Sequence, residues 1–254
     1  MTRFSANLGF LWTDRALPDA IRAAHAAGFD AVECHWPYDI AADDVAAALA
    51  ETGLPMLGLN TRRGDVAAGE NGLAALPGRV DEARAAIDEA LTYADAIGAG
   101  AVHVMAGKAE GPEARAVFAA NLHYACARAA KGGRIILIEP LNPFDAPGYF
   151  LNTTAQAANL ITEIAAPNLK LMFDCYHVGR TEGDVIARLR ALWPIIGHIQ
   201  FAAVPDRGPP DHGDLDYRAV FAEIAAHAWD KPLGAEYRPT GKTEDSLGWM
   251  AEFG

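Results

Sequence analysis

The chain has 254 residues, of which 51% are hydrophobic and 21% are charged, and it carries a formal net charge of −12. This acidic surplus argues against a protein whose main partner is a nucleic acid, because such proteins present an excess of Lys and Arg on one face. No stretch approaches the roughly 20 consecutive apolar residues of a membrane span, and the first residues lack the features of a signal peptide.

The three cysteines, Cys34, Cys126 and Cys175, are scattered and form no Cys-x-x-Cys pair. A set of this kind is typical of reduced thiols. We therefore expect a cytoplasmic protein that binds neither membrane nor nucleic acid.

Short apolar runs alternate with longer Ala-rich amphipathic segments, a pattern typical of βα units and a parallel sheet. The apolar runs predict strands near residues 4–10, 31–36, 55–60, 100–105, 134–139, 170–174, 196–201 and 233–237. The amphipathic segments predict helices near residues 17–27, 41–52, 79–98, 112–131, 153–165, 182–192, 216–228 and 243–251. Pro112 falls in a first turn, Gly53 lies just past a helix end, and Asn152 or Thr153 can cap a helix.

Eight strands, each followed by a helix, predict an α/β fold of the (β/α)8 TIM barrel type, with residues 1–254 as a single domain. A doubly wound open sheet is the structural alternative. That fold usually carries a glycine-rich phosphate turn, and no G-x-G-x-x-G follows the first predicted strand. In a TIM barrel the active site lies at the carboxyl ends of the strands, so functional residues are sought there.

The segment "RIILIEPLN", residues 134–142, carries a carboxylate directly after four apolar residues. Burying an unpaired carboxylate costs on the order of several kcal/mol, so a cation near Glu139 is one way to offset the cost. Strand six likewise ends in Asp174, strand seven carries Gln200 and strand eight ends in Glu236. Oxygen ligands of this kind suit Mg2+ or Mn2+ better than Zn2+. The structural alternative is that each residue is a strand-end cap or a surface salt-bridge partner.

Other polar side chains are expected at the same carboxyl ends of the strands. His177 is expected in the loop after strand six, poised to hydrogen-bond a substrate, and Arg207 is a candidate for holding an anionic substrate through its planar guanidinium. His198 shares a strand face with Gln200 and is expected to pack or to support the site from below. The ends of strands two to four supply four further substrate-binding candidates: Glu33, His35, Asn60 and His103.

Several motifs together resemble the hydroxypyruvate isomerase family of the xylose isomerase-like barrel superfamily. The motifs are "ILIEPLNPFDAPGYFLNTTAQA", "KLMFDCYHVGRTEGD", "IGHIQFA", "GAEYRP", "GDVAAGENGLAALPGR" and "TEDSLGW". The similarity runs from about residue 4 to residue 250. The loops after strands five and seven depart from the family pattern, for example at Pro143, Phe144 and Ala203.

The resemblance implies a divalent metal bound by Glu139, Asp174, Gln200 and Glu236. It also implies that Glu139 and Glu236 flank the substrate as a proton shuttle that interconverts hydroxypyruvate and tartronate semialdehyde, with related members acting on larger 2-oxo acids such as 2-oxo-tetronate. A homodimer or homotetramer is the assembly that the resemblance suggests. The substrate is expected to be a small molecule.

Five other functions stay open. Epimerisation of a ketose uses similar groups, although epimerases on this barrel typically have a His where Gln200 stands. The same barrel could also carry another sugar or polyol isomerase, or a dehydratase of a cyclic polyol ketone. A DNA repair endonuclease on this barrel would need many His ligands and a basic surface, which eight histidines and a net charge of −12 do not favour. A ligand-binding barrel that has lost catalysis is the last alternative.

Overall fold

The structure is a computed structural model that describes residues 2–254. Eight parallel strands form one sheet in the order β2-β1-β8-β7-β6-β5-β4-β3. The strands are β1 Phe4–Asn7, β2 Ala31–Glu33, β3 Gly58–Asn60, β4 Ala101–His103, β5 Ile135–Ile138, β6 Leu169–Asp174, β7 Ile196–Phe201 and β8 Leu233–Ala235. Backbone hydrogen bonds from Leu57 to Val32 and from Cys34 to Gly58 join the two edge strands, β2 and β3. The predicted (β/α)8 barrel is confirmed.

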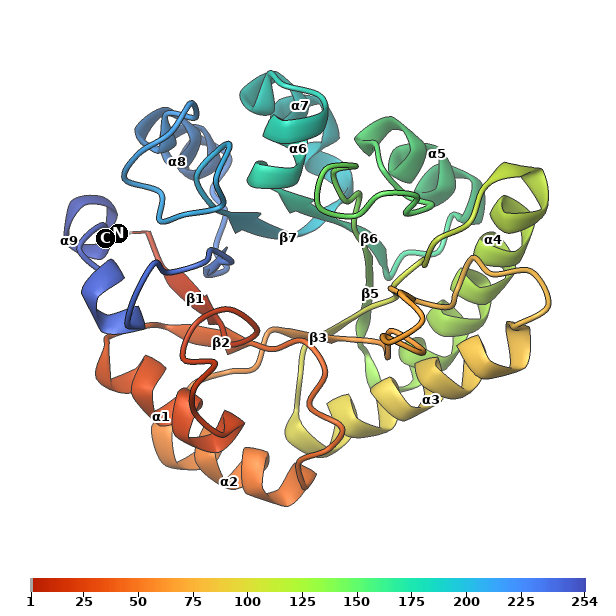
Figure 1. Ribbon diagram of the computed structural model, residues 1–254, viewed down its shortest axis with the longest axis horizontal. Coiled ribbons are helices and arrows are strands. Elements are labelled where there is room, and N and C mark those ends of the chain that lie inside the picture. Colours follow the sequence, from red (N-terminus) through yellow and green to blue (C-terminus); the bar gives the residue numbers. More distant parts are fainter. Residues whose placement is uncertain (1) are drawn as a thin grey trace.

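The helices form a ring outside the strands (Figure 1). They are α1 Leu17–Ala26, α2 Ala42–Thr52, α3 Val80–Ile97, α4 Gly111–Ala129, α5 Thr154–Ile164, α6 Cys175–Thr181, α7 Val185–Leu192, α8 Tyr217–Ala226 and α9 Met250–Phe253. Three short 3-10 segments cover Ala130–Gly132, Trp193–Ile195 and Thr243–Ser246. Within residues 2–254, no helix combines the length and apolarity needed to cross a membrane.

Local signals explain most helix boundaries. The Thr153 side chain accepts a hydrogen bond from the backbone N–H of Gln156 and caps α5, and Gly53 ends α2 in the left-handed conformation. Two expectations were wrong. Residues 175–181 form the short helix α6, capped by Asp174, where a loop was expected, and the helix expected over 243–251 is a 3-10 turn followed by α9.

The C-terminal segment packs against the outer face of the sheet at β1 and β7. Trp249 is buried, and its ring lies 4.8 Å from Phe4 and 5.4 Å from Phe201 between centroids. The two chain ends consequently lie side by side (Figure 1). Because Asn7 and Gln200 point into the barrel, Phe4 and Phe201 face outwards, and this aromatic cluster fills the layer between the strands and the helices α8 and α9.

Strand periodicity divides the barrel interior into layers. Ala101, Leu137 and Met172 pack together as a small apolar cluster. Because side chains alternate between the two faces of a strand, the inward residues two positions further along are His103, Glu139 and Asp174. The same rule applied to the other strands makes the upper interior of the barrel polar.

Candidate active site

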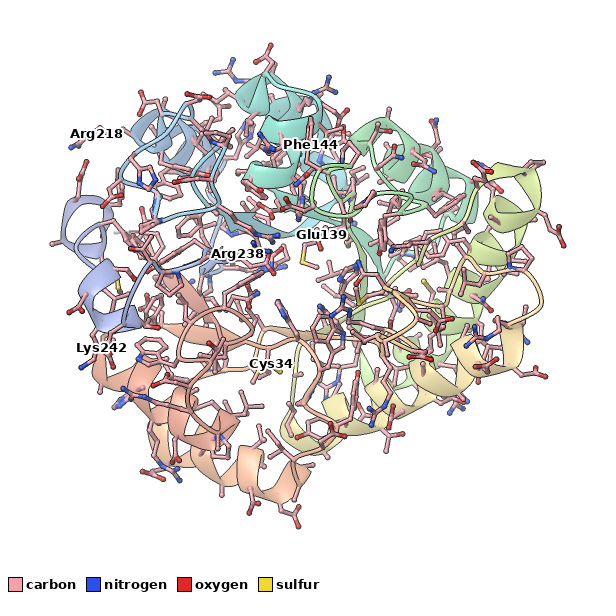
Figure 2. The ribbon with its side chains drawn as sticks, viewed as in Figure 1. Cys34, Glu139, Phe144, Arg218, Arg238 and Lys242 are labelled. Atoms are coloured by element: carbon pink, nitrogen blue, oxygen red, sulfur yellow. The ribbon has the colours of Figure 1, made fainter. Side chains whose placement is uncertain are left out.

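Four acidic or imidazole side chains converge at the carboxyl ends of β5, β6 and β8. One ligand atom from each of Glu139, Asp174, His177 and Glu236 lies within 4.8 Å of the others, and all four residues are buried. Glu139 directly follows β5, Glu236 directly follows β8, and Asp174 ends β6. Figure 2 shows Glu139 near the centre of the ring of strands. This cluster could hold a metal ion.

Three oxygen atoms at this cluster are buried without a hydrogen-bond partner in residues 2–254. They are Oε1 of Glu139, Oδ2 of Asp174 and Oε1 of Gln200. Leaving a buried acceptor unsatisfied costs about 1–3 kcal/mol, and more for a charged group. The three atoms belong to three of the four residues predicted as metal ligands, and hard oxygen donors of this type fit a divalent cation. These unpartnered oxygens therefore support a cation site at the cluster independently of the family resemblance.

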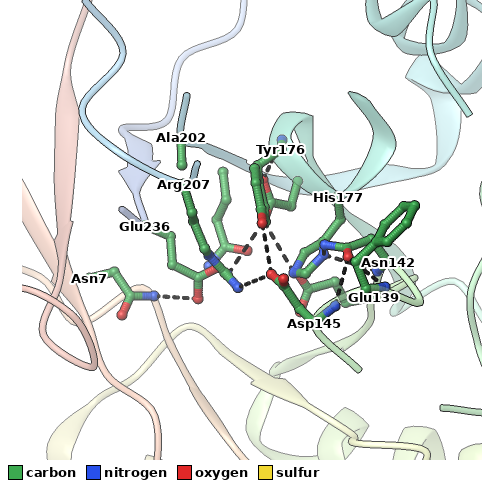
Figure 3. A network of polar contacts seen from close by, with 12 residues as sticks. Asn7, Glu139, Asn142, Asp145, Tyr176, His177, Ala202, Arg207 and Glu236 are labelled. Carbon is green, nitrogen blue, oxygen red and sulfur yellow. Dashed lines mark hydrogen bonds and ion pairs between the residues drawn. The ribbon is translucent and has the colours of Figure 1, made fainter. Parts of the chain in front are cut away.

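Arg207 places a positive charge inside the cluster (Figure 3). Its Nη2 lies 2.6 Å from Oε2 of Glu236 and 3.9 Å from Oδ2 of Asp174, and its Nη1 lies 3.3 Å from Oδ2 of Asp145. The guanidinium also lies between the rings of Phe10 and Tyr176, 4.7 and 4.9 Å from their centroids. These contacts fix the guanidinium plane and neutralise part of the charge of the carboxylates.

The backbone around Arg207 holds this side chain in place. Arg207 has a left-handed conformation with φ of 60°, its N–H donates to the carbonyl of Ala203, and its carbonyl accepts from the N–H of Arg238. The last bond ties the loop after β7 to the segment after Glu236. The ion pair between Arg207 and Glu236 is thus supported from the main chain on both sides.

The two glutamates have opposite electrostatic environments. Burial alone would raise the pKa of Glu236, but the charge of Arg207 and a hydrogen bond from His35 hold that pKa well below its usual range. Burial, followed by the charges of Glu236 and Asp174, raises the pKa of Glu139 well above its usual range. Burial and the charge of Glu236 raise the pKa of Asp174 to about 7. In the metal-free cluster, protons therefore bind to Glu139 and Asp174 in preference to Glu236, which stays ionised.

Hydrogen bonds fix the tautomer of His177. Nδ1 of its ring accepts from the backbone N–H of Asn142 at 3.0 Å and contacts the Asn142 amide nitrogen at 2.7 Å. The Asn142 amide cannot turn over, because its oxygen accepts from the N–H groups of Phe144 and Asp145. Burial lowers the pKa of His177 to about 3, so the ring is neutral and its proton is on Nε2. That N–H points at Glu139 and Asp174, 3.8 and 3.6 Å away.

A cavity of about 300 Å³ opens above the cluster. Besides the two glutamates, its lining includes five of the residues predicted to face the substrate: His35, Asn60, His103, His177 and Arg207. His35 donates from Nε2 to Oε1 of Glu236, since that carboxylate is ionised, over 3.1 Å. Burial lowers the pKa of His103 to about 3, and neither of its ring nitrogens has a partner in residues 2–254. The cavity can therefore supply neutral imidazoles as well as the charged Arg207.

The chain is similar to known proteins over its whole length. The model of the family described as xylose isomerase-like TIM barrel matches residues 21–253. The chain belongs to this family. It is 44% identical to the 2-oxo-tetronate isomerase of Cupriavidus necator, over 100% of this chain and 99% of that protein. It is 36% identical to the hydroxypyruvate isomerase of Escherichia coli K12, over the full length of both. A crystal structure titled AP endonuclease, family 2, from Brucella melitensis is 37% identical, covers 100% of this chain and 99% of that one, and superimposes with a TM-score of 0.96.

These matches confirm the resemblance to hydroxypyruvate isomerases that the sequence motifs indicate. Within this xylose isomerase-like barrel, one predicted residue lies elsewhere than expected. Glu33 is not among the residues that line this cavity, but lies beneath it beside a smaller pocket of about 20 Å³. The inward positions of β2 explain the difference, because His35 occupies the upper position and Glu33 the one below it. His198 also lies in this lower layer, as expected.

The sequence reasoning missed several residues of the site. Asn7 donates to both Glu33 and Glu236, and it was passed over because the first strand was expected to end at residue 10 and not at Asn7. Asn142 and Asp145 form a turn after β5 that holds His177 and Arg207. The Asn-Pro pair at 142–143 was a usable turn signal. Arg63 and Arg238 also line the cavity.

Proposed function

We propose that this protein is a divalent-metal-dependent isomerase that moves the oxo group of a small 2-oxo-3-hydroxy acid from C2 to C3. Hydroxypyruvate, which gives tartronate semialdehyde, and the four-carbon 2-oxo-tetronate are the proposed substrates, because relatives carry these names over the full length of the chain. The observation that carries the proposal is the set of three unpartnered buried oxygens beside two glutamates that face one cavity. The same proton movement serves both acids.

The proposed reaction needs two proton-transfer groups on a fixed frame. One glutamate takes the proton from C3, the C2 carbonyl oxygen gains a proton, and an enediol forms between C2 and C3. The other glutamate then gives a proton to C2, while the C3 hydroxyl loses its proton and becomes the new carbonyl. Glu139 and Glu236 are the proposed pair, with either as the first base. His177 Nε2–H is the proposed donor to a substrate oxygen, and the strand ends keep all three groups rigid.

The proposed ligands of the metal are Glu139, Asp174, Gln200 and Glu236. Mg2+ or Mn2+ is the proposed ion, because the donors are three carboxylates and one amide oxygen. When bound, the ion supplies Lewis-acid polarisation of the substrate oxygens. His177 is not proposed as a ligand, since its Nε2 carries the proton in the tautomer that Asn142 imposes.

A deuterium exchange experiment tests the proposed reaction. The protein is incubated in D2O with Mg2+ or Mn2+ and with hydroxypyruvate, 2-oxo-tetronate or a ketose of equal length, and proton NMR follows each compound. We expect deuterium at C2 of the isomerised product or at C3 of the recovered acid. If metal is bound and neither acid exchanges, the proposed function is wrong, and exchange confined to a ketose would favour a sugar isomerase or epimerase instead.

Arg207 is the proposed anchor of the substrate carboxylate. Glu236 and Asp145 occupy two of its five N–H groups, so donors remain for a ligand in the cavity. Arg207→Ala should raise KM for hydroxypyruvate by about 10- to 100-fold, the equivalent of one or two charge-assisted hydrogen bonds. The inhibition constant of dihydroxyacetone, which has a hydroxymethyl group in place of the carboxylate, should change much less.

The matched control for this prediction is Arg180→Ala. Arg180 stacks on Phe144 and is not part of the cavity lining. It should leave KM for hydroxypyruvate near the native value. Equal losses for the acid and its neutral counterpart in Arg207→Ala would show that Arg207 acts through Glu236 only.

Metal binding should depend on pH through Asp174. Its pKa is raised from about 3.8 to about 7 in the folded protein, so the metal-free protein holds a proton there that the unfolded chain has lost. This proton increases the free energy of unfolding of the metal-free protein, and the increase is fully present below about pH 4. The increase disappears as the pH rises to about 7. A cation must displace the proton. The Kd for Mn2+, measured by calorimetry, should therefore weaken by at least roughly tenfold per pH unit below pH 7, and by more where Glu139, whose pKa is also raised, must lose a proton too. A Kd that is constant between about pH 6 and 7.5 would contradict the prediction.

A further inference from the structure

A buried hydrogen-bond network lies directly beneath the cluster and is centred on Glu33. Oε1 of Glu33 accepts from Nε2 of Gln200 and from Nδ2 of Asn7, each at 3.0 Å. Oε2 of Glu33 lies 2.5 Å from Nε2 of His198. Glu33, Gln200, Asn7 and His198 are all buried, with at most 6% of their surface exposed. One carboxylate thus receives three donors from two other strands, β1 and β7.

This arrangement decides which way two amide groups point. An amide has a donor end and an acceptor end, and Glu33 accepts only, so the nitrogen of Gln200 must face Glu33 and its oxygen must face away. That oxygen, Oε1, is the buried acceptor without a partner in residues 2–254. The amide of Asn7 is fixed in the same way, because its oxygen accepts from the N–H of Gly9 and its nitrogen also donates to Oε1 of Glu236 at 2.9 Å.

The backbone of β8 leaves space for this network. A Cβ at Gly234 would lie 2.6 Å from Oε1 of Glu33, 2.8 Å from Cγ of Gln200 and 3.0 Å from Nε2 of His198. The three side chains therefore pack onto the bare backbone at this position. Gly234 is two residues before Glu236, so the support and the proposed ligand come from the same strand.

We infer that Glu33 is a positioning residue that turns the oxygen of the Gln200 amide towards the cation site and, through Asn7, fixes the carboxylate of Glu236. This role replaces the substrate contact expected from the sequence, since Glu33 lies below the open cavity. The inference rests on the proposed metal site. Supporting residues of this kind typically contribute 10- to 100-fold to metal affinity.

A double-mutant cycle on Mn2+ binding tests the inference. The Kd for Mn2+ is measured by calorimetry for the native protein, Glu33→Leu, Gln200→Ala and the double variant. A leucine at position 33 has about the shape of glutamate, but it accepts no hydrogen bond from Gln200, Asn7 or His198. We expect Glu33→Leu to weaken Mn2+ binding by about 10- to 100-fold in the native background. In the Gln200→Ala background the loss should shrink to a few fold, which is the part carried by Asn7 and Glu236.

Each outcome of the cycle is decisive. Native affinity in Glu33→Leu would overturn the inference, and so would an equal loss in both backgrounds, because that would indicate general loosening of the barrel. A native protein that binds no Mn2+ would instead overturn the proposed function. Thermal unfolding of each variant shows whether it has folded.

A second pair of variants perturbs the network without removing a polar group. Gly234→Ala should weaken Mn2+ binding at least tenfold, because the added methyl group displaces Glu33 and Gln200. Gly58→Ala is the matched control on β3, where the nearest atom to the new Cβ, the carbonyl oxygen of Ala101, lies at an ordinary 3.4 Å. Equal Mn2+ affinities in the two alanine variants would contradict the role of Glu33.

Discussion

Glu139→Gln and Glu236→Gln are each expected to reduce turnover of the acid substrate by about 10³-fold or more, because each removes one of the two proposed proton-transfer groups. The two variants should differ in stability. Oε1 of Glu139 has no partner in residues 2–254, and the raised pKa of this carboxyl reflects burial among like charges. An amide at this position is neutral without having to bind a proton, so metal-free Glu139→Gln should unfold at the native temperature or above it.

Glu236→Gln should instead lower the free energy of unfolding. Oε2 of Glu236 accepts from Arg207, and Oε1 accepts from Asn7 and His35. An amide can accept on one side only, so one set of donors loses its partner at a cost of about 1–3 kcal/mol. Thermal unfolding of the two metal-free variants measures the difference. A common shift in melting temperature would contradict the opposite environments of the two carboxylates.

Deuterium exchange separates the roles of the two glutamates. The variant that keeps the first base should still exchange the C3 hydrogen of the substrate in D2O without forming product, and the other variant should do neither. Glu182→Gln is the matched control, since Glu182 bonds the start of α5 outside the cavity. It should keep full turnover. Isomerisation near the native rate in either active-site variant would reject the two-glutamate shuttle.

The fold could be predicted because each βα unit carries its own signal. A parallel strand in a barrel is covered on both faces, so "RIILIE" is a continuous apolar run, and the amphipathic helices between such runs have a different period. The short helix α6 carried no such signal. Seven residues do not form a stable helix alone, and α6 depends on the Asp174 cap and on packing, so His177 was expected in a loop.

The candidate site was predictable in part for a related reason. Glu139, Asp174 and Glu236 follow apolar strands, which makes a buried charge visible in the sequence. Which oxygen lacks a partner, and which residue supplies the missing donor, depends on contacts between distant strands. Asn7 and Glu236 are 229 residues apart, and no local pattern in the chain indicates that they meet.

Removal of the metal is expected to abolish turnover and to lower the melting temperature without unfolding the chain. A cation present at about 100 times its Kd adds about 2.7 kcal/mol to the free energy of unfolding, which corresponds to roughly 5–10 °C for a chain of this length.

The metal-free protein should stay folded at neutral pH, because Arg207 neutralises Glu236 while Glu139 and Asp174 can hold protons. Dialysis against a chelator, metal analysis, calorimetric melting and readdition of Mg2+ or Mn2+ make the measurement. If turnover and melting temperature are unchanged after verified removal, the charge that offsets the carboxylates in the working enzyme is Arg207 and not a metal ion. In that case Arg207→Ala, rather than chelation, would be the change that abolishes turnover.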